Sequence, residues 1–262
     1  MRKGVLARLV LLYDGGMMMY LLLFAAGLWA GAQNALAGGG SFVTLPALIF
    51  AGLDPRAANI TSTIALFPGQ ITTGYAGRSL VAGAERLSFR TLAALSLVGG
   101  IAGAFVLLRT PPAVFAALVP WLVLIATALF AWSSFSPNKA VAPAPPPAWV
   151  SALIQGSIAV YSGFFGGGAG ILTLAALTLA RMPVKNAAGT KNVLVAISNI
   201  AAAFVFALSG IVAWRLAVAV GAGSMLGGWA GAVLLKRVAP MPLKIGVVVI
   251  GLALTVGLFV RG

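Results

Sequence analysis

Long apolar runs follow one another along the whole chain and limit it to very few fold classes. They cover residues 17–37, 41–53, 60–77, 87–108, 113–132, 149–165, 170–180, 187–208, 212–235 and 243–260. As helices, most of them are long enough to cross a hydrocarbon core of about 30 Å. The runs are apolar on every face, whereas the strands of a membrane barrel alternate apolar and polar residues. The sequence therefore predicts an all-α membrane protein, a polytopic helical bundle of eight to ten hydrophobic segments.

The composition supports this class and excludes others. Of the 262 residues, 61% are hydrophobic and 8% are charged, and the mean hydropathy is +1.08. These values lie far from those of ordinary soluble domains. Cysteine and histidine are absent, so the sequence offers no disulfide, no haem ligand and no cluster of soft metal ligands. We therefore expect neither a metal site nor a cofactor.

The charge is strongly positive, with 17 Lys and Arg residues against Asp14, Asp54 and Glu85. The basic residues are scattered at the ends of the apolar runs, where they meet anionic headgroups, and we expect no nucleic-acid partner. The three carboxylates also lie at run ends or in loops. A buried carboxylate for cation coupling, a catalytic carboxylate pair and a Ser-His-Asp triad are therefore missing. The sequence predicts no catalytic residues and no enzyme activity.

The two halves of the chain resemble each other. Gly38-Gly39, Thr44-Leu45 and Ala47-Leu48 recur as Gly167-Gly168, Thr173-Leu174 and Ala176-Leu177, and residues 99–104 recur at 227–232. Such self-similarity indicates a tandem duplication. We predict a first membrane repeat at residues 1–132, a Pro-rich linker at 133–148 and a second membrane repeat at 149–262.

The sequence leaves the relative direction of the two repeats open. Five spanning segments per half make inverted repeats, whereas four spanning segments with one re-entrant segment make parallel repeats. Lys and Arg are divided nearly evenly between the two faces under either count, so the positive-inside rule does not decide. We favour inverted repeats because they are common in transporters. Residues 1–13 are basic and Leu-rich, and we expect them to form a short helix along the membrane surface.

Glycine-rich stretches interrupt the apolar pattern at equivalent places in the two halves, at residues 38–40 and 166–170. The run at 41–53 is also too short, since it extends about 20 Å as a helix. Unpaired backbone groups in hydrocarbon cost several kcal/mol, so such interruptions are tolerated inside protein or beside a wet cavity. We therefore predict broken or re-entrant helices whose N-termini point into a cavity and favour an anion. The alternative is that the glycines let helices pack closely, as we expect for 99–103.

Polar side chains follow each glycine stretch. Thr61, Ser62 and Gln70 of the first half align with Thr190, Lys191 and Asn199 of the second, and Asn192 lies beside Lys191. Such side chains either join helices by hydrogen bonds or line a pathway. Lys191 aligns with Ser62, so the halves are chemically unequal there. Its amine either contacts an anion directly or reaches out to the membrane interface.

The glycine-rich stretch at 38–40, the following Pro46, the stretch Ala58–Ser62 and the weaker echo Ala187–Thr190 carry a family resemblance. Over nearly its whole length the chain resembles the sulfite exporter TauE/SafE family. The resemblance implies a multi-pass permease of the plasma membrane, with about seven to eight spans. It also implies that the substrates are sulfur-containing anions such as sulfite, sulfoacetate or related organosulfonates. The second half departs from the family's Thr-Ser pattern at Thr190-Lys191, so binding need not be symmetric.

We therefore expect a transporter of small sulfur-containing oxyanions that binds the anion between the two repeats, near the middle of the membrane. The alternatives are a passive anion channel with the same pore and a membrane scaffold that transports nothing. The expected partners are a small anion of the sulfite or sulfonate class and the lipid bilayer, with a homodimer left open. The candidate substrate-binding residues are Gly38, Gly39, Gly40, Thr61, Ser62, Gln70, Gly166, Gly167, Gly168, Thr190, Lys191, Asn192 and Asn199.

Overall fold

The computed structural model describes residues 2–36, 39–76, 78–84, 86–135, 145–234 and 240–261. This part of the chain is helical, and its one β feature is a single bridge between Ala84 and Leu87. The helices are α1 (Arg2–Leu36), α2 (Ser41–Phe50), α3 (Pro55–Ala76), α4 (Phe89–Arg109), α5 (Pro112–Phe135), α6 (Ala148–Phe164), α7 (Ala169–Leu179), α8 (Val184–Ala207), α9 (Trp214–Leu234) and α10 (Pro240–Arg261). A 3-10 turn at Arg78–Leu80 lies between α3 and α4. The all-helical prediction is confirmed.

Several helices are built to lie in lipid. By length and composition, four helical segments of the described chain can cross a membrane: Gly16–Ala35, Phe89–Arg109, Pro112–Trp132 and Val184–Ala207. Large apolar side chains such as Trp132, Phe204 and Trp229 lie exposed on the outside of the bundle. Exposed apolar surface on this scale suits a hydrocarbon environment rather than water.

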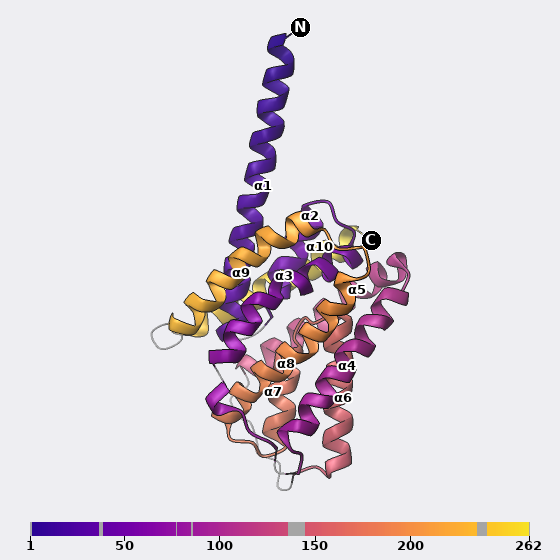
Figure 1. Cartoon of the computed structure of the whole chain (residues 1–262), viewed down its shortest axis with the longest axis vertical. Coiled ribbons are helices and arrows are strands. Elements are labelled where there is room, and N and C mark those ends of the chain that lie inside the picture. Colours follow the sequence, from indigo (N-terminus) through magenta and orange to yellow (C-terminus); the bar gives the residue numbers. More distant parts are fainter. Residues whose placement is uncertain are drawn as a thin grey trace.

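The first helix differs from its prediction. Helix α1 runs without a break from Arg2 to Leu36, and its N-terminal part extends beyond the other helices (Figure 1). Residues 2–13 are therefore not a separate short helix, because they are the first turns of α1. At the predicted linker, α5 ends at Phe135 and α6 begins at Ala148, and residues 136–144 lie outside the described residues.

Glycines set the closest helix contact, between α1 and α9 (Figure 1). A side chain at Gly27 would collide with the Val220 carbonyl, and one at Gly31 would collide with the Ser224 carbonyl. Backbones approach this closely where no Cβ stands between them. The contacting residue numbers rise together in the two helices, so α1 and α9 run parallel.

The same packing joins α4 to α6, where a side chain at Gly103 would collide with the Val160 carbonyl. Gly99 also contacts Ala159, so α4 and α6 run parallel as well. The Gly-xxx-Gly pattern at 99–103 is thus a close-packing device, as predicted.

Helix α3 contacts both α9 and α8, and these contacts show in which direction each of the two runs relative to α3. Gly221 of α9 lies near Ala65 and Gly69 lies against Ser224, so α3 and α9 run parallel. Towards α8 the order reverses, because Gln70 bonds to Asn199 while Gly74 lies near Asn192. Helices α3 and α8 therefore run antiparallel.

These directions determine the path of the chain at the first glycine stretch. Helices α1 and α3 are both parallel to α9, so the chain must return between them. Helix α2, about 15 Å long, makes this return together with the residues that flank it. The returning helix packs against both α1 and α3.

Candidate functional site

Both glycine-rich stretches separate two helices, as the sequence predicted. The first lies between α1 and α2, and the second lies between α6 and α7. Gly39 has φ 85°, and Gly166 and Gly168 have φ 77° and 78°. These left-handed conformations are accessible to glycine without strain and end a helix. Gly38 lies outside the described residues.

Side chains from the preceding helix hold each interruption in place. In the first, Gln33 Nε2 donates to the Gly39 carbonyl at 2.9 Å, and the Gly40 N–H donates to Asn34 Oδ1 at 2.7 Å. In the second, the Tyr161 hydroxyl donates to the Gly167 carbonyl at 2.6 Å. Backbone groups freed from the helix thus find partners in α1 and α6, which keeps the interruptions ordered.

The two interruptions meet at one cavity, together with the C-terminal part of α3 and the middle of α8. The empty space at the cavity, counted together with the open solvent at its mouth, is about 430 Å³. It is lined by Asn34, Gly39, Ser41, Gln70, Thr73, Gly166, Gly170, Lys191, Asn192, Val195 and Asn199. The described lining residues include no Asp or Glu.

Lys191 gives the cavity its charge. Its side chain is 7% exposed, and a Cβ at Gly170 would lie 4.0 Å from Nζ. In the described part of the chain, no hydrogen bond or ion pair engages this amine. A buried cation is stable when a counter-charge pairs with it, so the cavity fits an anionic ligand.

Two helix N-termini add to the positive electrostatic potential that Lys191 gives the cavity. Ser41 and Gly170 lie in the first turns of α2 and α7, and both line the cavity. Within the described residues, no hydrogen bond engages the backbone N–H of either residue. Helix N-termini carry partial positive charge and donate to anions. The cavity therefore combines a full positive charge, two helix dipoles and several amides.

A chain of hydrogen bonds crosses the cavity wall from α6 to α3. The Ser162 hydroxyl donates to Asn199 Oδ1 at 3.1 Å, and Asn199 Nδ2 donates to Gln70 Oε1 at 3.0 Å. Gln70 and Asn199 occupy aligned positions in the two halves, so equivalent residues meet each other here. In this arrangement the oxygen of each amide accepts from the preceding residue of the chain of bonds.

The predicted site residues fall into two groups. Those that line the cavity are Gly39, Gln70, Gly166, Lys191, Asn192 and Asn199. Those that lie elsewhere are Gly40, Thr61, Ser62, Gly167, Gly168 and Thr190. The first group comes from both interruptions and from both polar stretches, so the structure brings the two halves together at one place.

The hydroxyls outside the cavity have other partners. Thr61 accepts from the Ala213 N–H at 3.2 Å, and Thr190 accepts from the Ala82 N–H at 3.0 Å. The Ser62 hydroxyl pairs with that of Thr44 at 2.6 Å. In this structure these side chains join α3 and α8 to neighbouring loops or to α2, and they do not face the cavity.

Sequence reasoning missed three polar residues of the lining: Asn34, Ser41 and Thr73. Asn34 and Ser41 flank the first glycine stretch, and Thr73 lies three residues after Gln70, on the same helix face. Their positions close to the predicted residues could have indicated that they line the same cavity.

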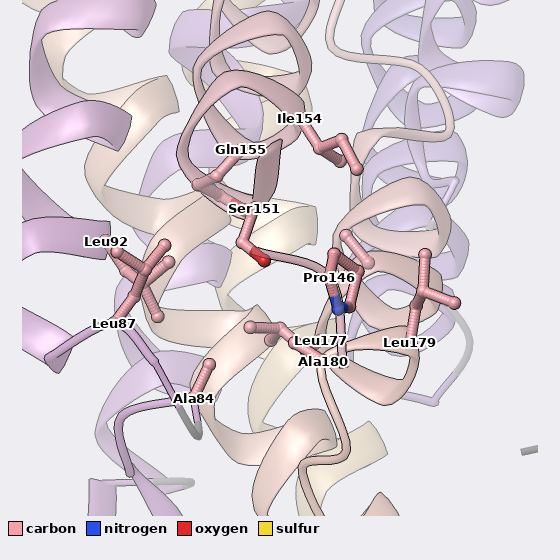
Figure 2. Close-up of a pocket in the computed structure, with 11 residues that line it drawn as sticks. Ala84, Leu87, Leu92, Pro146, Ser151, Ile154, Gln155, Leu177, Leu179 and Ala180 are labelled. Atoms are coloured by element: carbon pink, nitrogen blue, oxygen red, sulfur yellow. The ribbon is translucent and has the colours of Figure 1, made fainter. Parts of the chain in front are cut away.

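A second cavity is more apolar. It lies among the loop before α4, the start of α6 and the end of α7, as Figure 2 shows. Leucine, isoleucine, alanine and proline make up most of its wall, with Ser151 and Gln155 as the polar members. Gln155 Nε2 donates to Ser96 Oγ at 3.0 Å, while its Oε1 has no partner. The described lining carries no charge, which makes it a weaker candidate than the cavity at Lys191.

Comparison with known proteins gives consistent results. The chain is 28% identical to a probable membrane transporter protein of Haemophilus influenzae, with 84% of this chain and 86% of that protein covered. It is 33% identical to the probable membrane transporter protein ORF9 of a Sinorhizobium species, with 80% of each covered. The probable membrane transporter protein YfcA of Escherichia coli is 28% identical over 79% of this chain and 77% of its own.

No solved structure matches the chain at a comparable level. A family model, sulfite exporter TauE/SafE, matches residues 23–258 and so covers most of the sequence. The helical architecture, the apolar exterior and these relatives agree on a membrane transporter. The chain belongs to the sulfite exporter TauE/SafE family.

Proposed function

We propose that this chain is a permease for small sulfur-containing oxyanions, such as sulfite or organosulfonates, and that the anion binds in the cavity at Lys191. The observation that carries the proposal is the buried amine of Lys191, which has no partner among the described residues and lies beside the N-termini of α2 and α7. No carboxylate of the described lining competes with an anion for it. The family name supports the substrate class.

Each group of the cavity has a role in this proposal. The Ser41 and Gly170 backbone N–H groups hydrogen-bond the oxyanion, as helix N-termini do in many anion sites. The amides of Asn34 and Gln70 orient it, and Lys191 balances its charge. These groups come from both halves of the chain, so movement of one half against the other changes the site.

We also propose that the two halves are inverted repeats. Three contacts support this: aligned helices α3 and α8 run antiparallel, aligned residues Gln70 and Asn199 bond to each other, and the pair α1·α9 has its counterpart in α6·α4. Inverted repeats with a site at their interface are a common transporter design. A multi-pass location in the plasma membrane accords with this design.

Transport by the purified full-length chain in lipid vesicles tests the proposal. Sulfite, thiosulfate, organosulfonates, sulfate and chloride are offered as labelled substrates in parallel. We expect saturable flux of sulfite or a sulfonate, accelerated by the same anion on the opposite side. Non-saturating flux without counter-transport indicates a passive channel, and no flux of any anion contradicts the proposal.

A pair of glycine variants ties the flux to the cavity. Gly39→Leu forces a side chain onto a residue with φ 85°, against the Phe42 ring at 3.0 Å, and is expected to abolish flux. Gly156→Leu is the matched control, because a Cβ there meets nothing within 4 Å, and it should keep flux. Undiminished flux in Gly39→Leu removes the cavity from the pathway.

A further inference from the structure

We infer that the cavity selects oxyanions by their protonation, accepting a head group that only accepts hydrogen bonds and rejecting one of equal shape and charge that still carries a proton. A sulfonate belongs to the first kind, and a singly protonated phosphonate belongs to the second. This inference rests on the proposed function, because it concerns the same site. It follows from an inventory of the donors and acceptors that the cavity leaves free.

Asn34 presents a donor to the cavity. Its Oδ1 accepts from the Gly40 N–H at 2.7 Å, and a backbone N–H can only be satisfied by an acceptor. The orientation of the amide is therefore fixed, and Nδ2 is the group left over. Asn34 is half-buried in the cavity wall, so this N–H₂ is available to a ligand there.

Each amide oxygen around Gln70 already accepts one hydrogen bond. Asn199 Oδ1 accepts from Ser162, and Gln70 Oε1 accepts from Asn199. The Gly39 carbonyl accepts from both Gln33 Nε2 and the Phe42 N–H, each at 2.9 Å. What remains on this wall is the Nε2 of Gln70, again a donor.

The remaining groups are also mostly donors. Lys191 and the Gly170 N–H have no lone pair to offer. The hydroxyl oxygens of Ser41 and Thr73 and the side-chain Oδ1 of Asn192 are the polar side-chain oxygens of the described lining that accept no hydrogen bond within it. A proton on the ligand must find one of these three oxygens or share an amide oxygen that already accepts a bond, whereas every oxygen of a fully deprotonated head group finds a donor. A ligand O–H that faces another donor loses a hydrogen bond and leaves both groups unsatisfied.

Methanesulfonate and methylphosphonate test this directly. In mildly acidic buffer both are monoanions of nearly the same shape, and methylphosphonate keeps one acidic proton. Titration calorimetry of the purified full-length chain is expected to show methanesulfonate binding about 10- to 100-fold more tightly. Equal affinities, or tighter binding of methylphosphonate, overturn the selection and leave the proposed function standing. If neither of these ligands nor sulfite binds, the proposed function itself fails.

Asn34→Asp sharpens the test. The substitution keeps an oxygen for the Gly40 N–H and replaces the free donor by an acceptor. Its negative charge weakens both monoanions alike, so the ratio of their affinities isolates the effect of the donor. We expect the preference for methanesulfonate to fall by about tenfold or to reverse.

Asn186→Asp makes the same chemical change outside the cavity, where Asn186 Nδ2 bonds to the Leu80 carbonyl, and should keep the wild-type ratio. An unchanged ratio in Asn34→Asp, with both affinities reduced in proportion, overturns the assignment of the Asn34 donor. That result means that Asn34 only holds the glycine stretch in place through its bond to the Gly40 N–H.

Discussion

Two sets of positions that align between the halves differ in openness and charge. Lys191, Asn192 and Val195 of α8 line the cavity. Their counterparts Ser62, Thr63 and Leu66 of α3 are buried in the bundle, with Leu66 1% exposed. Ser62 is also occupied by its hydrogen bond to Thr44. Both halves line the cavity, but among the described lining residues the charged side chain comes from the second half alone.

This difference separates the features that the two aligned halves share from those that they do not. Helix packing through glycine is alike in the pairs α1·α9 and α4·α6. The chemistry at the centre is unequal, because a single lysine replaces a serine. The proposed inverted repeat therefore gives a pseudo-symmetric frame around a site whose charge comes from the second half.

The largest expected effect tests the shared frame. Gly99→Leu and Gly227→Leu alter aligned positions, and each side chain would meet the backbone of a neighbouring helix. Each variant should lose about 3 kcal/mol of stability or more, because overpacking displaces whole helices. Thermal unfolding of the purified protein in detergent measures this, with Gly257→Leu as the control since a Cβ there meets nothing within 4 Å. If only one of the two variants loses stability, the helix pairs α1·α9 and α4·α6 are not equivalent.

The next effect tests the unequal centre. Lys191→Met removes the positive charge and should weaken sulfite or sulfonate binding about 100-fold, as loss of a charged hydrogen bond does. Ser62→Ala, at the aligned position, should instead cost about 1 kcal/mol of stability through loss of the Thr44 bond. Binding titrations and unfolding curves on both variants compare the two. Lys185→Met is the control for the charge, because Lys185 is exposed and lies outside the cavity lining. A similar loss of binding in Ser62→Ala and Lys191→Met contradicts the assignment of the site's charge to the second half alone.

A smaller effect compares the braces of the two glycine stretches. Asn34→Ala and Tyr161→Phe each remove one hydrogen bond to the interrupted backbone and should each cost about 1–2 kcal/mol of stability. Asn34 also lines the cavity, so its variant should weaken anion binding about tenfold in addition. Tyr161→Phe should affect binding less. If Tyr161→Phe weakens anion binding more than Asn34→Ala does, the ligand lies nearer the second glycine stretch than we propose.

The smallest perturbation probes openness directly. The chain contains no cysteine, so Val195→Cys and Leu66→Cys introduce single thiols at aligned positions. A polar maleimide should modify the first about tenfold faster or more, since thiol reactivity follows exposure. Modification rates followed by mass spectrometry give the answer, and preincubation with sulfite should slow the reaction at residue 195. Equal rates contradict the difference in openness.

Much of the fold was readable from apolar runs alone. The run predicted at 187–208 became α8, which begins three residues earlier, directly after Pro183. The runs at 41–53 and 170–180 became the short helices α2 and α7. Charge counting left the direction of the repeats open, whereas the contact between Gln70 and Asn199 bears on it. The relative direction of the two repeats depends on which residues contact each other between helices, and composition does not determine those contacts.

The site was readable in part, for a similar reason. Glycine and lysine in apolar sequence are costly enough to signal a cavity, and Gly39 and Lys191 do line one. A threonine at a helix start carries no such signal. Thr61 and Thr190 bind loops that lie far away in the sequence, and local spacing could not distinguish that role from ligand binding.

The packing of α1 on α9 also bears on how the protein is made. The glycine surface of the first helix finds its main partner only when the ribosome has completed the ninth. Until α9 is synthesised, the glycine surface of α1 lacks its main packing partner. The two halves therefore cannot complete their folding independently. Co-expressed fragments divided within residues 136–144 should therefore stabilise each other, and either fragment alone should be degraded.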